Sequence, residues 1–297
     1  MAQWTAKRIN RAIELLEADQ ALYYDGPHTG HVLTYEQGKK DAKTWADYIN
    51  VGMEHGAFDM TGLEAYMRGL VDGGPTNSGH RAPTVIVEAP VNGIDGPNVA
   101  FNAWQFRQIL ARGAHGILLC QAENADAVRE FVRACRFPHH KIGVDRLGIG
   151  SRGRGSEPTA APIWGIDQTE HFKRCEPWAV SPKGELLLGV KIESPPGVEN
   201  CEEILAVPGL GFAELGPGDL GLSLGYTTLQ RRPYPAEMEA ARAKVFAACR
   251  RNKLAFLEGQ RPDTIVAALD EGVRVIAGHN PEVAKLGRAH QKRAMPV

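Results

Sequence analysis

The chain has 297 residues, of which 43% are hydrophobic and 23% are charged, close to the averages of globular proteins. This length is sufficient to bury a sizeable core, and the composition excludes a disordered chain. The 34 Lys and Arg residues balance 35 Asp and Glu residues, for a net charge of −1. We therefore expect no nucleic-acid partner and no binding to anionic membranes. The longest apolar runs are far shorter than the ~20 residues of a membrane-spanning helix.

The N-terminal segment lacks the apolar core of a signal peptide. The cysteines are scattered, odd in number and form no CxxC pair, which argues against both a disulfide framework and a thiolate zinc site. They are Cys120, Cys135, Cys175, Cys201 and Cys249. We therefore expect a cytoplasmic protein.

Strand-like and helical segments alternate along the chain. The apolar spacing of Ile9, Ile13 and Leu16 predicts a first helix over residues 3–18. Short apolar runs predict strands over residues 21–24, 48–53, 84–88, 116–120, 187–193, 212–215, 254–257 and 274–277. Helical patterns follow over residues 60–70, 100–111, 125–135, 198–206, 236–250, 264–270 and 281–294.

Eight strand–helix units in about 250–300 residues are typical of a (β/α)8 TIM barrel. Most of the runs are continuously apolar, as in strands that are buried on both faces. We therefore predict a single barrel domain over residues 1–297. The alternative is a doubly wound open sheet. That fold usually carries a Gly-rich phosphate loop after its first strand, and residues 25–30 lack the GxGxxG spacing.

Residues 138–183 interrupt this alternation and show little helical or strand pattern. Loops of this length are usually functional or disordered. Trp164, Phe172 and Trp178 argue against disorder. We expect a long loop excursion before the fifth strand that covers the surface of a neighbouring subunit.

Two carboxylates follow neighbouring strands where a barrel places its active residues. Glu193 ends the strand at 187–193, and Asp219 follows the strand at 212–215. Without Cys or His beside them, they suit a hard cation such as Mg²⁺ or Mn²⁺. Helix capping is the alternative role for either residue. The glycines that flank Pro217 favour the ligand site, because they let the backbone approach a ligand closely.

The segment that carries these carboxylates, KIESPPGVENCEEILAVPGLGFAELGPGDLGLSLGY (191–226), resembles the metal-ligand region of the HpcH/HpaI aldolases. YINVGMEHGAFD (48–59) is similar to the segment with that family's catalytic histidine, and residues 110–136 resemble its fourth strand and helix. The resemblance extends from about residue 6 to 290. It implies a class II aldolase, a carbon–carbon lyase that cleaves or forms 2-oxo acids, with an aldehyde partner, through a pyruvate-type enolate.

The resemblance also implies roles for individual residues. Glu193 and Asp219 would hold a divalent Mg²⁺, Mn²⁺ or Co²⁺ ion. Backbone N–H groups of the turn Gly216, Pro217 and Gly218 would bind the substrate carboxylate. His55 would be the general base, since imidazole transfers protons near pH 7; its alternative is a surface loop histidine.

Three positions depart from the family's pattern. Gly52 stands where an acid usually precedes the catalytic histidine, and Glu88 stands where an arginine usually binds the pyruvate carbonyl oxygen. Lys191 replaces a common glutamine and shares a strand face with Glu193. We expect Lys191 to supply the missing positive charge to the substrate, or to pair with Glu88, which holds it in place or acts as an extra acid or base. Arg152, or its neighbour Arg154, is a further candidate for that charge.

Other interpretations stay open. A CoA-ester lyase of the citrate lyase β-subunit type would need a basic surface for the CoA phosphates, and a degenerate barrel would bind an acidic metabolite without turnover. His28 and His31 are interpreted as surface residues. Because relatives exchange C-terminal helices between barrels, we expect exchange of the helix at 281–294 and a homo-oligomer, from dimer to hexamer.

Overall fold

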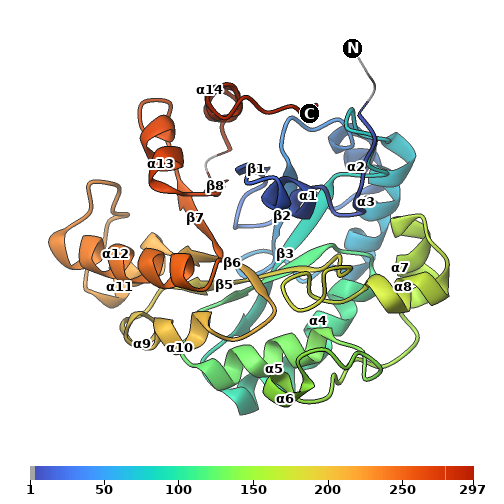
Figure 1. The fold of residues 1–297 in the computed structure, drawn as a ribbon, viewed down its shortest axis with the longest axis horizontal. Coiled ribbons are helices and arrows are strands. Elements are labelled where there is room, and N and C mark those ends of the chain that lie inside the picture. The colour runs from blue at the N-terminus through green and yellow to red at the C-terminus, as the bar shows by residue number, and fades with distance from the viewer. Residues whose placement is uncertain (1–3, 278) are drawn as a thin grey trace.

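The computed structural model describes residues 4–277 and 279–297. Within them, eight parallel strands close into a barrel in chain order, and helices surround the strands (Figure 1). The strands are β1 (Leu22–Asp25), β2 (Tyr48–Gly52), β3 (Thr84–Asn92), β4 (Gly116–Cys120), β5 (Leu187–Ile192), β6 (Leu210–Leu215), β7 (Ala255–Gly259) and β8 (Val275–Ala277). This arrangement confirms the predicted (β/α)8 barrel. Over the described residues, each helix is too short or too polar to cross a membrane.

Most helices begin at a polar residue whose side chain accepts a backbone N–H of the first turn. Asn10, Asp59, Asp95 and Asn124 do this for α1, α3, α4 and α5. The helices are α1 (Arg11–Glu17), α2 (Tyr35–Asp41), α3 (Met60–Gly73), α4 (Gly96–Ala111), α5 (Ala125–Cys135), α6 (Val144–Leu147), α7 (Glu157–Trp164), α8 (Gln168–Arg174), α9 (Pro195–Glu199), α10 (Cys201–Leu205), α11 (Pro217–Ser223), α12 (Ala236–Arg251), α13 (Ile265–Glu271) and α14 (Pro281–His290).

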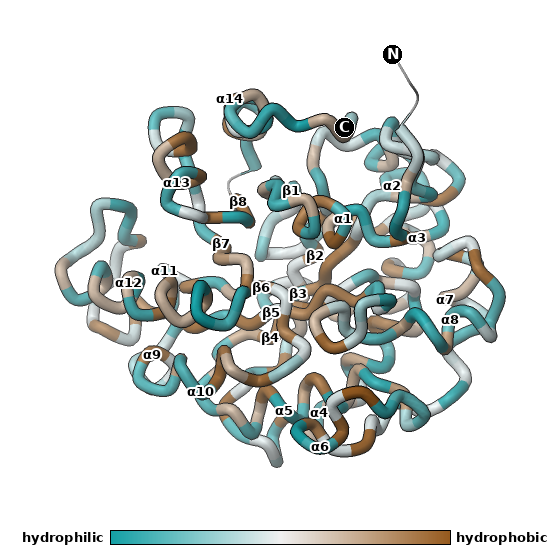
Figure 2. The backbone as a smooth tube through the Cα atoms, in the orientation of Figure 1, coloured by the Kyte–Doolittle hydropathy of each residue, from teal (hydrophilic) through white to brown (hydrophobic). Residues whose placement is uncertain are grey.

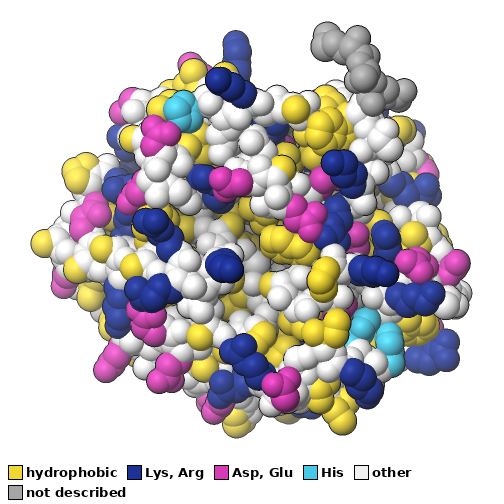
Figure 3. Space-filling model, viewed as in Figure 1, with side chains coloured by type: hydrophobic (Ala, Val, Ile, Leu, Met, Phe, Trp, Pro, Cys, Tyr) yellow, Lys and Arg dark blue, Asp and Glu magenta, His cyan; other side chains and the backbone are white. Residues whose placement is uncertain are grey.

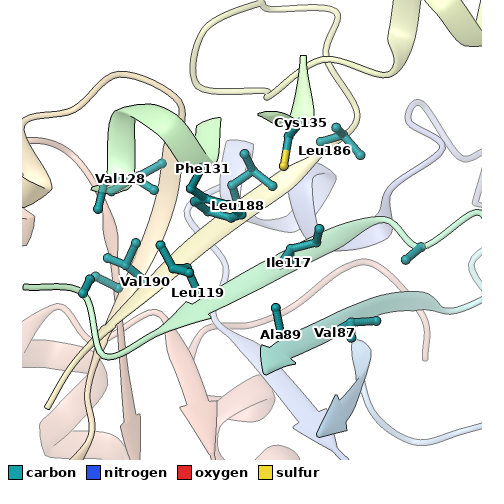
Figure 4. Packing of buried hydrophobic residues seen from close by; sticks show 14 of the residues in the cluster. Val87, Ala89, Ile117, Leu119, Val128, Phe131, Cys135, Leu186, Leu188 and Val190 are labelled. Atoms are coloured by element: carbon teal, nitrogen blue, oxygen red, sulfur yellow. The ribbon is translucent and has the colours of Figure 1, made fainter. Parts of the chain in front are cut away.

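The main core lies between the strands and the surrounding helices. Leu119 of β4 and Leu188 and Val190 of β5 pack beneath Val128 and Phe131 of α5 (Figure 4). The apolar strands lie in the middle of the molecule, whereas the helices carry their polar side outward (Figure 2). On the face in view, charges of both signs are interspersed (Figure 3). Burial of both strand faces explains the continuous apolar runs in the sequence.

A second apolar cluster fills the amino-terminal half of the barrel lumen. Inward-facing Ile86, Leu187 and Phe212 meet Ile13 of α1, which closes this end. Gly189 makes room for the ring of Phe212, because a Cβ atom at this position would lie 2.4 Å from it. The lumen is therefore packed with apolar side chains at its amino end.

The first predicted helix was too long. It begins at Arg11, because the Asn10 side chain caps it by accepting the N–H of Ala12. The preceding backbone is held outside the helix by the Glu14 carboxylate, which accepts the N–H groups of Lys7 and Arg8. Residue 3, where the helix was predicted to begin, lies outside the described residues.

The excursion at 138–183 is not an irregular loop, since α6, α7 and α8 lie within it. Each has at most eight residues, too few for a recognisable helical period. Pro158 and Pro162 also obscured α7. The expected long insertion before β5 is present, but part of it is helical, which its sequence pattern did not indicate.

The C-terminal helix packs on its own barrel. Gly287 of α14 lies against the Tyr23 side chain, and Arg288 donates to the carbonyl oxygen of Trp45 at 2.8 Å. Arg293 pairs with the buried Asp47 at 2.7 Å. Exchange of this helix between barrels stays a prediction.

Candidate active site at the carboxyl end of the barrel

Inward-facing side chains change from apolar to polar toward the carboxyl ends of the strands. Successive inward residues are two positions apart on a strand. Tyr48, Ile86, Gly189 and Phe212 are therefore followed in the lumen by Asn50, Glu88, Lys191 and Glu214, all of them buried. This arrangement places a charged layer directly above the apolar packing of the lumen.

Lys191 lies at the centre of this layer. Its Nζ atom donates to Glu54 Oε2 at 2.5 Å and lies 3.6 Å from Glu88 Oε2. Burial opposes its charge, but the surrounding acidic groups, including Glu214 and Glu193, raise the pKa of Lys191 above its usual value. Lys191 is therefore a buried ammonium group held by two carboxylates.

Glu193 follows β5 and is buried at the rim of the barrel. Its Oε1 atom accepts the N–H of Gln121 at 2.7 Å. Gly216 allows the carboxylate to lie this close to β6, because a Cβ atom there would be 2.2 Å from Glu193 Oε2. Burial raises the pKa of Glu193 to about 8, with Lys191 opposing the shift and Glu54 adding to it. A bound cation would offset this cost of ionisation.

Glu54 belongs to two groups of possible metal ligands. Ligand atoms of Glu54, Cys120 and Glu193 lie within 4.8 Å of one another, and so do those of Glu54, His55 and Asp219. Carboxylate oxygens are the donors that Mg²⁺ and similar hard cations prefer. The residues present therefore fit a divalent ion. The sequence interpretation did not propose Glu54 as a ligand, although its position directly after β2 was the available signal.

His55 lies at the entrance, with 52% of its side chain exposed and its Nε2 atom 3.7 Å from Glu54 Oε2. An acid three residues before His55, which the resemblance led us to expect, has no room here. A Cβ atom at Gly52 would lie 2.2 Å from the carbonyl oxygen of His28. Glu54 is thus the carboxylate beside His55, and the role of His55 as a base stays a prediction.

The turn at the start of α11 offers fewer N–H groups than we expected from the sequence. Gly216 donates its N–H to the carbonyl oxygen of Ile192 at 3.0 Å, and Pro217 has none. Gly218 and Asp219 lie in the first helical turn, where amides have no partner within the helix. Only these two amides can bind a substrate carboxylate, so the expectation for Gly216 and Pro217 was wrong.

Arg152 is not brought to this site. It donates to Cys175 Sγ at 2.7 Å and to Ser156 Oγ at 2.9 Å, and its guanidinium lies over the ring of Phe137. Its backbone N–H donates to the carbonyl oxygen of Arg136. Arg136 follows α5 directly and lies at the amino-terminal side of the barrel. Arg152 therefore cannot place its positive charge next to the substrate.

The sequence interpretation assigned neither His28, which contacts the charged layer, nor Glu214, which belongs to it, to the site. His28 is half-buried, with Nδ1 2.6 Å from Glu88 Oε1, rather than a free surface residue. Glu214 faces the lumen from β6, and burial raises its pKa to about 7, with Lys191 and His28 opposing the shift. The signal for Glu214 was its place two residues after the inward-facing Phe212.

The sequence profile of the HpcH/HpaI aldolase/citrate lyase family matches residues 96–277. Hydroxypyruvate/pyruvate aldolase of Roseobacter denitrificans is 29% identical over 175 residues, 59% of this chain and 60% of the relative. The 2-keto-3-deoxy-L-rhamnonate aldolase of Klebsiella pneumoniae is 35% identical over 120 residues, 40% of this chain and 39% of the relative. The chain thus matches less than two thirds of the length of these curated relatives.

Solved structures share the fold over nearly the whole chain. An HpcH/HpaI aldolase/citrate lyase family protein from Burkholderia cenocepacia has a TM-score of 0.69 at 22% identity, covering 95% of this chain and 96% of that one. Macrophomate synthase has a TM-score of 0.65 at 21% identity, covering 99% and 91%.

Proposed function

The chain belongs to the HpcH/HpaI aldolase/citrate lyase family, and we propose that it is a divalent-metal-dependent carbon–carbon lyase of the class II aldolase type. Its substrates would be 2-oxo acids that are cleaved to, or formed from, pyruvate or a close analogue and an aldehyde. The observation that carries the proposal is the pair of possible ligand groups at the carboxyl end of the barrel, one with Glu193 and one with Asp219, which share Glu54. The aldolase activities of the relatives named above support it.

Glu193, Asp219 and Glu54 would hold the ion, which we propose to be Mg²⁺, Mn²⁺ or Co²⁺. When bound, it would supply Lewis-acid stabilisation of the negative charge that develops on the keto oxygen of the substrate. The residues of the chain itself bind and orient the substrate and move its protons.

The amide of Gly218 would bind the substrate carboxylate, since first-turn amides favour anions. His55 would take the proton from the hydroxyl group of the carbon that leaves as the aldehyde, and its exposure gives it access to that group. Lys191 would place positive charge near the substrate oxygens, held by Glu54 and Glu88. The apolar packing of the lumen closes the site from below.

An assay for pyruvate release tests the proposal. The protein is stripped with EDTA, supplied with Mg²⁺, Mn²⁺ or Co²⁺, and incubated with 4-hydroxy-2-oxo acids of different chain lengths. We expect metal-dependent release of pyruvate. Cleavage of CoA thioesters alone would instead indicate a citrate lyase β-type enzyme, and tight binding without turnover would indicate a degenerate barrel. The basic loop at 152–154, the candidate surface for CoA phosphates, lies away from the charged layer.

We also propose a cytoplasmic homo-oligomer. The cysteines are all free and buried, which suits a reducing compartment. On α4, Phe101 is 84% exposed and Trp104 is 44% exposed, three residues apart on one helix face. Light scattering is expected to give a mass well above that of the 32.3 kDa chain, whereas a clean monomer at micromolar concentration would contradict this assembly.

A further inference from the structure

His28 lies over the mouth of the lumen because two glycines let its loop close on β2. Gly26 has a φ of +116°, and a Cβ atom there would lie 2.0 Å from the carbonyl oxygen of Asn50. Gly52 packs in the same way against the backbone of His28. The loop after β1 is thereby fixed to its neighbouring strand, and the His28 ring is directed toward β3.

The ring of His28 is held by a buried carboxylate. Its Nδ1 atom lies 2.6 Å from Glu88 Oε1, and Glu88 is 1% exposed. The same oxygen accepts the side-chain N–H of Asn50 at 3.0 Å, so Glu88 cannot turn away without losing two bonds. Because an ionised carboxylate only accepts hydrogen bonds, Nδ1 carries a proton.

Four titratable groups, on β1, β3, β5 and β6, surround the ring. The hydrogen bond that His28 donates to Glu88 of β3 raises the pKa of His28 most, and burial opposes this shift. Glu214 of β6 raises the pKa further, whereas Lys191 of β5 lowers it. The hydroxyl oxygen of Tyr24 of β1 lies 3.4 Å from His28 Nε2, which is long for a hydrogen bond. The net effect favours the imidazolium form.

His28 and Lys191 differ in their freedom to meet a substrate. The Lys191 side chain is 5% exposed and is fixed between two carboxylates, and breaking a buried ion pair is costly. The His28 side chain is 42% exposed, and among the described residues its Nε2 atom has only the long contact with Tyr24. Of the two, His28 can offer an N–H to a ligand while every buried ion pair stays intact.

We propose that His28 is a catalytic residue whose Nε2–H group donates a hydrogen bond to the keto oxygen of the substrate, with Glu88 as its positioning residue. This inference rests on the proposed aldolase function. The proposal also explains the carboxylate of Glu88, which would repel an enolate if the two were in contact. The imidazolium of His28 lies between Glu88 and the substrate.

His28 does not transfer its proton in the proposed cleavage. In cleavage, the hydroxyl proton at C4 leaves to the base, the C3–C4 electron pair moves into a C2–C3 double bond, and C4 departs as an aldehyde carbonyl. The negative charge arrives on the C2 oxygen, where His28 strengthens its hydrogen bond and keeps its proton. The base then returns its proton to C3, which gives pyruvate. Loss of one such donor typically lowers the rate by about 10²–10³-fold.

Oxalate, a stable analogue of the pyruvate enolate, is the probe for the test. We would measure its affinity for the Mn²⁺-loaded protein by calorimetry, together with kcat and KM for cleavage, in His28→Ala and Glu88→Gln. The control is His31→Ala, because His31 lies in the same loop but bonds to Asp41 and Tyr66 instead. We expect His28→Ala to weaken oxalate binding at least tenfold and to lower kcat about 100-fold, with unchanged Mn²⁺ affinity. His31→Ala is expected to match the wild type.

A second readout does not depend on activity. An NMR titration of the His28 ring should give a pKa above the ordinary value of about 6.5, which Glu88→Gln should lower. Wild-type oxalate affinity in a folded His28→Ala variant, or a His28 pKa that is insensitive to Glu88→Gln, would overturn the role of His28 alone. A wild-type protein that neither binds oxalate nor releases pyruvate with any of the three metals would overturn the proposed function and this role together.

Discussion

The two halves of the barrel lumen differ sharply although the same strands build both. Toward the amino ends, Ile86, Leu187 and Phe212 pack against α1. Two to four residues further along these strands, Glu88, Lys191 and Glu214 form a buried charged layer. Burying charges costs free energy even when they are paired. The comparison therefore indicates that the amino half stabilises the fold. The carboxyl half lowers the stability, because it buries the charged groups that the proposed reaction needs.

The largest effect is expected from the candidate metal ligands of the carboxyl half. Glu193→Gln and Asp219→Asn should each abolish Mn²⁺ binding and activity, because each removes a charged oxygen donor. Their unfolding temperatures should stay near the wild-type value, since neither side chain belongs to the apolar core. Calorimetric Mn²⁺ titration measures the binding. Glu202→Gln, at an exposed position of α10, is the matched control. Unchanged affinity in Glu193→Gln or Asp219→Asn would remove that residue from the site.

The reverse result is expected in the amino half. Phe212→Ala should lower the free energy of unfolding by about 3–5 kcal/mol, because the buried ring leaves a cavity beside Gly189. Its Mn²⁺ affinity should be preserved. Urea unfolding checks the stability, with Val32→Ala, at a 63% exposed position, as the control. A loss of metal binding at wild-type stability would contradict the division between the two halves.

Acid should destabilise the amino side through His115. This residue is buried at the start of β4, its Nδ1 atom accepts the N–H of Val85, and burial lowers its pKa to about 3. The unfolded chain takes up the proton near its ordinary pKa of about 6.5, so stability is full above that pH and is lost as the pH falls toward 3. The loss should be about 1.4 kcal/mol per pH unit.

Urea unfolding at pH 6.5 and 5.0 measures this dependence. His115→Gln should make it less steep, because one proton fewer is taken up on unfolding. Part of it should remain, since burial also lowers the pKa values of His80, His140 and His171. His290→Gln, near the end of α14, should leave it unchanged. The same pH dependence in His115→Gln and in the wild type would remove His115 as its source.

The smallest effect is expected for Lys191→Met. Removing the ammonium group should lower kcat/KM by at least about tenfold, or ~1.4 kcal/mol. Mn²⁺ affinity should not fall, because Lys191 competes with a cation for Glu54. Steady-state kinetics and calorimetry check both. Full activity in this variant would show that the charged layer needs no ammonium group.

The sequence predicted the fold well because the strands are marked by their apolar runs, and all eight were located to within a few residues. Short helices such as α2 and α7 escaped notice because seven or eight residues give no clear period. The positions of Glu193 and Asp219 at strand ends followed from the order of the units.

Contacts between distant segments could not be predicted in the same way. His28 reaches Glu88 only because Gly26 and Gly52 bring its loop onto β2, and this closure is a tertiary feature. Arg152, in a glycine-rich loop, was a candidate for the missing positive charge. Its burial against Phe137 and Cys175 depends on the tertiary fold of residues 138–183, which sequence spacing does not predict. Sequence spacing thus located strand-end residues but not the loops that fold over them.

The central claim is that the carboxyl half of the lumen forms a pyruvate enolate with the help of a divalent ion. Exchange of the methyl protons of pyruvate in D₂O, followed by proton NMR, tests it directly. We predict exchange by the wild type with Mg²⁺, Mn²⁺ or Co²⁺ that stops with EDTA or in Glu193→Gln and persists in Phe212→Ala. Absence of exchange with all three metals, or exchange at the wild-type rate in Glu193→Gln, would contradict the claim.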